Sequence, residues 1–189
     1  GEVSAEVIEK GIERVDNQIQ RASEVVNQVR SYAKGQRQRQ AIDVGKIAEK
    51  ILRDIQASSP DTEVEFQKEG ERFIVEANPI ELEIILINLV KNAIEVVKDK
   101  QNGRVIVNLS AEGNSVCIKV EDNGEKLNDA DWKQISQLAM ATTKHSGLGF
   151  GLTIVAGLAE DLGGRITFER LPTGGLSVYV RLPLAKEEM

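Results

Sequence analysis

The apolar residues of this chain follow two different spacing rules, one before and one after the polar segment at residues 35–40. Before it, residues 4–34 contain no proline and one glycine, and a series of apolar residues recurs at alternating spacings of four and three. This heptad pattern predicts a helix roughly 45 Å long, with an apolar stripe that a partner helix must cover. The stripe consists of Ile8, Ile12, Val15, Ile19, Ala22, Val26, Val29 and Ala33. A helix packed along its own domain is the alternative, which the polar segment disfavours.

After the polar segment, the pattern changes to that of a domain with mixed helices and strands. Asp43 is suited to cap a helix from Val44 to about Ser58, and Pro79 stands at the start of an apolar-rich helix that runs to about Lys98. Short runs of alternating apolar and polar residues, separated by turn residues, predict strands and hairpins. The predicted strands are 63–67, 73–76, 104–110, 116–121, 165–170 and 176–182, with a loop-rich stretch at 123–146 and a glycine-opened helix at 147–162.

Composition and charge exclude several classes of function. The formal net charge is −6, whereas a protein that binds nucleic acid needs a basic surface to displace counterions. No apolar run reaches the roughly 18 residues that span a bilayer, so we expect no membrane contact and a cytoplasmic location. The single cysteine, Cys117, lies between apolar neighbours, which predicts a buried strand position. One cysteine and one histidine cannot build a Cys/His metal cage, although carboxamides and phosphates could hold Mg²⁺.

The helix predicted from Pro79 carries the first residues suited to ligand binding. Asn88 and Asn92 are four residues apart and Glu95 is three further on, so the three side chains project from one face. The opposite face is apolar, with Leu82, Leu86, Leu89, Ala93 and Val97. The asparagines therefore stand at the margin of the core stripe, where they can point into a cleft. Carboxamide oxygens suit a Mg²⁺ that is already bound to phosphates, but solvated asparagines would show the same spacing.

Two further motifs follow along the chain. Asp122-Asn123-Gly124 ends a hydrophobic strand, where the carboxylate can accept a hydrogen bond from an exocyclic amine such as that of adenine. Thr142-Thr143-Lys144 precedes Gly147-Leu148-Gly149-Phe150-Gly151-Leu152, whose glycines allow close backbone approach and whose helix presents free N–H groups to phosphate. Each motif alone is weak, because such turns and helix starts are common. Their order and spacing together indicate a nucleotide site.

The motifs resemble the N box and the two glycine boxes of sensor histidine kinases, within the wider GHKL superfamily of ATP-binding domains. The resemblance covers residues from about 40 to 185 and rests on Asn88–Ala93, Asp122–Gly124, Thr142–Lys144 and Gly147–Leu152. Asn92–Glu95 is similar to the Asn-Ala-x-Glu of the nitrogen-regulation, oxygen-sensing and dicarboxylate-sensing subfamily. Residues 21–33 resemble the second helix of that subfamily's dimerisation unit. We therefore expect a partial dimerisation helix at 1–35, a linker at 36–40 and an ATP-binding catalytic domain at 41–189.

The resemblance implies a two-layer α/β sandwich of the Bergerat type, in which ATP lies between helices and a mixed sheet under a mobile lid. It implies that Asp122 binds the adenine amine, that Gly124 shapes the adenine pocket and that Asn92 holds Mg²⁺. Asn88, near the phosphates, and Lys144, which complements their charge, are the expected catalytic residues. The other residues expected to contact the nucleotide are Thr142, Thr143, Gly147, Leu148, Gly149, Gly151 and Leu152.

The nucleophile that the resemblance implies, a histidine on the first dimerisation helix, is not in the sequence. The one histidine, His145, directly follows Thr-Thr-Lys in the lid, and we do not expect it to be the acceptor. The chain is therefore expected to bind Mg-ATP and to transfer the γ-phosphoryl group to a histidine on a helix that it lacks, without autophosphorylating alone. The implied partners are a response regulator and a second copy of the chain, paired through the N-terminal helix.

Two departures from the family's pattern leave other functions open. Lys126 replaces the second glycine of the first glycine box, and residues 138–141 replace the aromatic cluster that anchors the lid. Both favour a degenerate module that dimerises and binds nucleotide without phosphotransfer. A further possibility is an ATP-hydrolysing relative, such as a topoisomerase or chaperone domain, with a glutamate base four residues before the Mg-binding asparagine. Asn88 occupies that position and a carboxamide is no base, so we expect negligible ATPase activity.

Overall fold

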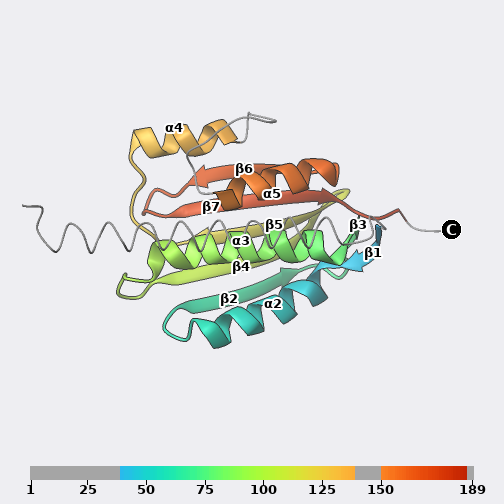
Figure 1. Cartoon of the computed structure of the whole chain (residues 1–189), viewed down its shortest axis with the longest axis horizontal. Coiled ribbons are helices and arrows are strands. Elements are labelled where there is room, and N and C mark those ends of the chain that lie inside the picture. The colour runs from blue at the N-terminus through green and yellow to red at the C-terminus, as the bar shows by residue number, and fades with distance from the viewer. Residues whose placement is uncertain (1–38, 139–149, 187–189) are drawn as a thin grey trace, which may run out of the picture. The chain divides into compact units, whose positions relative to one another are not determined.

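The computed structural model describes residues 39–138 and 150–186, which form an α/β domain of two layers (Figure 1). The helices are α2 (Val44–Ser58), α3 (Pro79–Val97), α4 (Asp129–Leu138) and α5 (Phe150–Asp161). The strands are β1 (Gln40–Asp43), β2 (Glu63–Glu69), β3 (Ile74–Ala77), β4 (Arg104–Glu112), β5 (Ser115–Asp122), β6 (Arg165–Arg170) and β7 (Leu176–Pro183). Within these ranges, no helix is both long and apolar enough to cross a membrane. The helix predicted over residues 4–34 lies outside the described residues.

Five strands form a mixed sheet in the order β2-β4-β5-β7-β6. Strands β2 and β4 run parallel, and the other neighbours pair antiparallel. The hairpins predicted around residues 113–114 and 172–175 are confirmed, as is the sandwich with a mixed sheet. Strands β1 and β3 form a separate antiparallel pair, which a bridge from Val75 to Leu184 joins to the chain just beyond β7.

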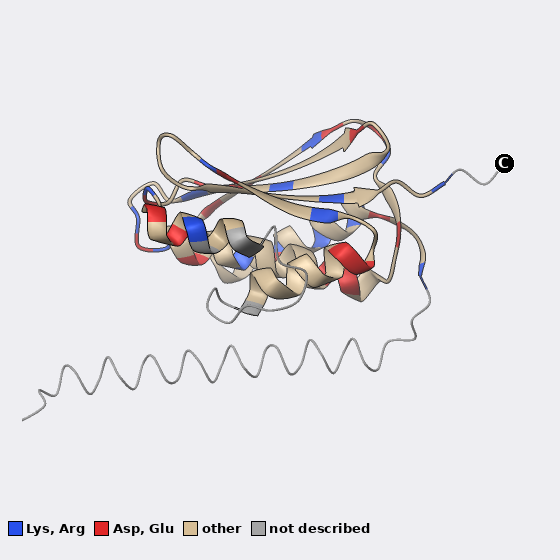
Figure 2. Ribbon diagram, turned by 90° about the horizontal axis from the view of Figure 1, so that it is seen from above, with Lys and Arg blue, Asp and Glu red and all other residues tan. Residues whose placement is uncertain are grey.

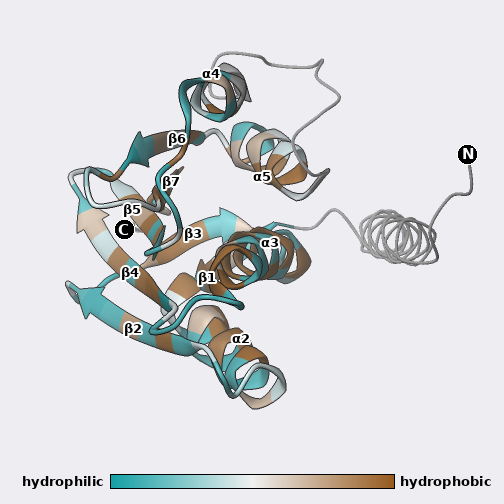
Figure 3. Ribbon diagram, turned by 90° about the vertical axis from the view of Figure 1, so that its left-hand side faces the viewer, coloured by the Kyte–Doolittle hydropathy of each residue, from teal (hydrophilic) through white to brown (hydrophobic). Residues whose placement is uncertain are grey.

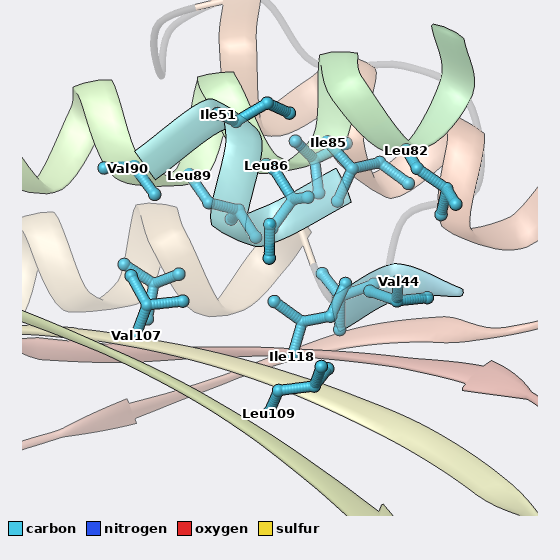
Figure 4. Packing of buried hydrophobic residues seen from close by; sticks show 14 of the residues in the cluster. Val44, Ile51, Leu82, Ile85, Leu86, Leu89, Val90, Val107, Leu109 and Ile118 are labelled. Atoms are coloured by element: carbon cyan, nitrogen blue, oxygen red, sulfur yellow. The ribbon is translucent and has the colours of Figure 1, made fainter. Parts of the chain in front are cut away.

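One face of the sheet is covered by α2, α3 and α5, and a continuous apolar core lies between the two layers (Figure 4). The core includes Val44, Ile51, Leu82, Ile85, Leu86, Leu89, Val90, Val107, Leu109 and Ile118. Cys117 is buried in β5, as predicted. Burying an aliphatic side chain of this size contributes about 1.5–3 kcal/mol, so the core fixes how each helix is rotated about its axis.

Charged residues occur along the strands of the sheet (Figure 2), and they form ion pairs within one strand and across an intervening strand. Lys119 and Glu121 of β5 form an ion pair at 2.6 Å, and Arg181 of β7 reaches Glu112 of β4 at 2.9 Å. Burial alone would raise the pKa of the Glu121 carboxyl, but hydrogen bonds from Lys119 and Ser177 bring the pKa below its usual value. The sheet therefore has one face for the core and one face for water.

A capping box fixes the start of α3. The side chain of Asn78 accepts a hydrogen bond from the Ile80 N–H at 2.9 Å, and the Glu81 carboxylate accepts one from the Asn78 N–H at 2.9 Å. Pro79 occupies the first helical position, where its missing N–H costs nothing. Glu81 is buried, and the guanidinium of Arg39 lies 4.0 Å from its carboxylate. These interactions begin the helix that carries Asn88 and Asn92.

The structure differs from the sequence-based expectation in two elements. The stretch 123–146 was expected to be loop-rich, but residues 129–138 form α4, with the side chain of Asn128 accepting the Asp131 N–H at 2.9 Å. The aspartates of this segment stabilise the first turn of a helix, which the loop interpretation overlooked. Gln40 was assigned to the linker but begins β1, whose partner β3 is more than 30 residues away in the chain.

We expect Asn78→Ala to lower the free energy of unfolding by about 1 kcal/mol, because an N–H group at the start of α3 loses its acceptor. Urea unfolding followed by circular dichroism measures the change. The matched control is Asn78→Ser, whose hydroxyl can still cap the helix and which should retain most of the stability. Equal losses in the two variants would show that the cap does not stabilise α3.

Candidate nucleotide-binding site

A pocket of about 150 Å³ opens between α3, α4, α5 and the adjoining ends of β5 and β7. Its apolar lining residues are Leu89, Ala93, Val96, Val120, Leu127, Ile135, Leu152, Leu176 and Val178. The others are Asn92, Asp122, Glu125 and Gly175. Pockets that enclose a whole small molecule usually measure about 300–1,000 Å³. This pocket therefore has room for a ring-sized group, from which the rest of a larger ligand would extend.

Asp122 places a buried carboxylate in these apolar surroundings at the end of β5. The residue is 6% exposed, and its Oδ1 accepts a hydrogen bond from the Gly124 N–H at 2.8 Å. Burial raises the pKa of the Asp122 carboxyl, and hydrogen bonds from the Gly124 and Leu176 backbone oppose this effect only in part. A carboxylate accepts hydrogen bonds and does not donate them, so this pocket suits an apolar ring with an amine at its edge.

Asn88 and Asn92 of α3 meet α5 at Gly151. A Cβ atom on Gly151 would lie 2.7 Å from Oδ1 of Asn88 and 3.3 Å from Nδ2 of Asn92, so a side chain there would collide with the first carboxamide. The Asn88 amide donates to the Ile84 carbonyl at 2.8 Å, which orients its Oδ1 toward α5. Carboxamide oxygens are ligands that Mg²⁺ accepts, and Asn92 also lines the pocket. The two carboxamides therefore stand where they could bind a cation at the edge of the pocket.

Two glycines allow the segment after Asp122 to pack closely against the turn between β6 and β7 and against α3. Gly175 has a φ of 93°, and a Cβ atom there would overlap the Asp122 carbonyl oxygen. The Gly175 N–H donates to the Glu125 carbonyl at 3.1 Å. A Cβ atom on Gly124 would overlap Val96 of α3. Glycine at these positions thus brings β7, α3 and the Asp122 segment together around the pocket.

Asn123 and Lys100 hold the same segment from the side of β4. The Asn123 side chain accepts the Arg104 N–H at 2.8 Å and donates to the Asn102 carbonyl at 2.8 Å. The ammonium group of Lys100 donates to the carbonyls of Asn123 and Gly124. The backbone around Asp122 is therefore fixed before any ligand arrives, which lowers the entropy lost on binding.

The structure brings part of the expected site together. Asn92, Asp122 and Leu152 line the same pocket, while Asn88, Gly124 and Gly151 lie directly beside lining residues. Thr142, Thr143, Lys144, Gly147, Leu148 and Gly149 lie outside the described residues, as does His145. Their roles stay predictions.

Several pocket residues were not expected from the sequence. Ile135 of α4 and Leu127, just before this helix, form one wall of the pocket. Gly175, just before β7, also lines it. Apolar residues among the polar ones of 127–135 and the glycine pair at 174–175 were the available signals. Neither signal shows which distant elements these residues contact.

Comparison with known proteins shows the family. Residues 77–186 match the family model described as histidine kinase-, DNA gyrase B-, and HSP90-like ATPase. The sensor protein FixL of Bradyrhizobium diazoefficiens is 27% identical over 184 residues, which are 95% of this chain and 36% of FixL. The chain thus spans 36% of the length of this relative.

Solved histidine kinases have the same fold. Histidine kinase ThkA, in complex with the response regulator protein TrrA, gives a TM-score of 0.68 at 21% identity over 97% of this chain and 53% of that chain. Full-length ShkA in complex with AMPPNP gives a TM-score of 0.68 at 19% identity over 100% of this chain and 41% of that chain.

The chain belongs to the histidine kinase-, DNA gyrase B- and HSP90-like ATPase family. Within this family, the chain is similar to a sensor protein and to solved histidine kinases.

We expect Asp122→Asn to change how the stability of the ligand-free domain depends on pH. Burial raises the pKa of Asp122 in the folded state, so at pH values just above the usual aspartate pKa the folded protein keeps a proton that the unfolded chain has lost. This contribution to stability is complete at lower pH and is lost as the pH rises through the folded pKa. An asparagine does not titrate, so the stability of the variant relative to the parent should increase with pH.

Urea unfolding of both proteins across the acidic range measures this difference. Asp54→Asn, on the exposed side of α2, is the matched control for the loss of one carboxylate. A stability difference between Asp122→Asn and the parent that does not change with pH would contradict the expected effect of burial.

Proposed function

We propose that this chain binds Mg-ATP and transfers its γ-phosphoryl group to a histidine on a dimerisation helix outside the chain, as a part of two-component signalling. The observation that carries the proposal is the pocket in which the buried Asp122 carboxylate faces apolar walls and Asn92 contributes a carboxamide. Adenine combines a flat apolar ring with an amine at its edge, and the polyphosphate with its cation would extend toward Asn92 and Asn88. This arrangement supports the binding of ATP in one orientation.

The proposed chemistry relies on positioning and charge. Asp122 would accept a hydrogen bond from the adenine amine, and Asn92 would be a ligand of Mg²⁺. Asn88 would lie near the phosphates, where Lys144 and the glycines at 147 and 149 are also expected. Mg²⁺ would neutralise phosphate charge, which is the main requirement of phosphoryl transfer once the acceptor is in line. The acceptor histidine would lie on a dimerisation helix outside the chain.

The relatives support the rest of the proposal. FixL is described as a sensor protein, ThkA forms a complex with a response regulator, and ShkA forms one with AMPPNP. We infer that this chain likewise uses a nucleoside triphosphate and acts on a pathway that ends in a response regulator. The pairing of two copies through residues 1–35, a cytoplasmic location and membership of the nitrogen-regulation, oxygen-sensing and dicarboxylate-sensing subfamily belong to the same proposal.

Nucleotide binding without phosphotransfer remains the second candidate, and Lys126 is one of its two supports. Asn102 is the one non-glycine residue with a positive φ in residues 39–138 and 150–186. Lys126 therefore adopts a backbone conformation that does not need glycine, and its presence brings no backbone strain to the first glycine box. This observation favours the active kinase domain over the degenerate module.

Two substitutions should distinguish the part of the site that binds adenine from the part that binds the metal and the phosphates. We expect Asp122→Asn to weaken the binding of both Mg-ATP and adenosine by about tenfold or more, because a hydrogen bond to a charged group contributes about 1.5–3 kcal/mol. Asn92→Ala should weaken Mg-ATP and leave adenosine unchanged, because adenosine carries no metal-bound phosphate. Isothermal titration calorimetry with the two ligands measures both effects. A loss of adenosine binding in Asn92→Ala would place this asparagine at the base and contradict its role with the metal.

A phosphotransfer assay distinguishes the candidate functions. The chain is mixed with radiolabelled Mg-ATP and a separate two-helix acceptor domain, and we expect acid-labile label on the acceptor histidine. Steady ATP hydrolysis should be negligible, because the carboxamide of Asn88 cannot take a proton from water. Rapid hydrolysis would favour an ATPase, and tight binding without transfer to several acceptor domains would favour the degenerate module.

A further inference from the structure

Helix α4 forms a wall of the pocket but does not belong to the layer made by α2 and α3. Figures 1 and 3 show α4 at the edge of the domain, beside β6 and α5. Leu127, just before the helix, and Ile135 within it line the pocket, and Ile135 is 6% exposed. The shape of the pocket therefore depends on how α4 is held at this edge.

The side chain of Arg170, the last residue of β6, makes three contacts with this segment: one to a backbone carbonyl, one to a carboxylate and one to an aromatic ring. Its Nη1 donates to the Leu127 carbonyl at 3.3 Å and to Oδ1 of Asp129 at 2.8 Å. The guanidinium carbon lies 5.6 Å from the centre of the Trp132 ring, within the range of a cation–π interaction. Trp132 and Ile135 are three residues apart, so they lie on the same side of α4. The arginine thus contacts both the start of the wall and the helix turn that precedes Ile135.

The contacts of Arg170 differ in how strongly they can hold the α4 segment in place. The Asp129 side chain is 95% exposed, so its ion pair with Arg170 is screened by water and adds little. The Arg170 side chain is 32% exposed, and its planar group can donate to the Leu127 carbonyl while it lies against Trp132. A lysine has no such plane and cannot make both contacts in the same way. The carbonyl and the ring, rather than the carboxylate, should therefore anchor the segment.

We propose that Arg170 is a positioning residue for nucleotide binding, which holds α4 against β6 so that Leu127 and Ile135 form the wall beside the base. Arg170 is not among the lining residues of the pocket and acts through α4. This inference rests on the proposed function, because the role that it assigns is in the binding of ATP.

Calorimetric titration of Mg-ATP and of adenosine into the parent, Arg170→Ala, Arg170→Lys and Asp129→Asn proteins tests the proposal. We expect Arg170→Ala to weaken both ligands by about tenfold, because both contain the base that contacts the wall. Arg170→Lys should recover part of this loss, and Asp129→Asn should stay within about twofold of the parent. Weakening of Mg-ATP alone, or equal effects of Arg170→Ala and Asp129→Asn, would overturn the proposal.

Hydrogen exchange of the ligand-free proteins tests the anchor without nucleotide. The α4 amides should exchange about tenfold faster in Arg170→Ala than in the parent, while the α3 amides keep their rates. Arg165→Ala, an exposed arginine at the other end of β6, is the matched control and should leave both helices unchanged. If the parent bound no Mg-ATP, the proposed function would fail. Faster exchange confined to α4 would still support the anchor, and unchanged α4 exchange would overturn it.

Discussion

The burial of one face of α3 against the sheet is the constraint on which the nucleotide site depends. Leu82, Leu86 and Leu89 are at most 2% exposed, and turning the helix to expose them would cost about 1.5–3 kcal/mol for each side chain. With that face fixed, Asn88 and Asn92 can stand only at the margin of the core, where they meet Gly151 of α5. The hydrophobic core, rather than a contact between the asparagines, therefore places the carboxamides beside the pocket.

Hydrogen bonds and close backbone packing, rather than an apolar stripe, hold the segment that carries the Asp122 carboxylate. Its burial opposes ionisation, as the raised pKa shows, and the segment that follows it is fastened by backbone hydrogen bonds, by Asn123 and by glycines that allow close packing. An acceptor in an apolar pocket binds an amine more strongly than an acceptor in water does, because no solvent competes for it. The burial of Asp122 thus lowers the stability of the domain, and under the proposed function the same burial would strengthen the contact with the adenine amine.

Local signals explain which elements the sequence predicts well. Asp43 and Asn78 cap helices whose starts were expected, and the turns at 113–114 and 172–175 define hairpins that the structure contains. Helix α4 was missed although its first-turn aspartates are a local signal, whereas the other failures depend on distant partners. Strand β1 has only four residues and exists because β3 pairs with it, and the wall formed by Leu127 and Ile135 depends on where α4 packs. A pattern within ten residues cannot report a contact with an element far along the chain.

The pocket therefore has two halves that are held with different strength. Leu89, Val120 and Val178 belong to the central core, so their half of the pocket can open only with the domain itself. The half on α4 is attached through Arg170 by contacts that are partly exposed to water. Opening free energies in a folded protein range from almost nothing to the full stability, and partly exposed elements lie at the low end. A ligand that fills the pocket touches both halves, so binding should order α4 more than it orders α3.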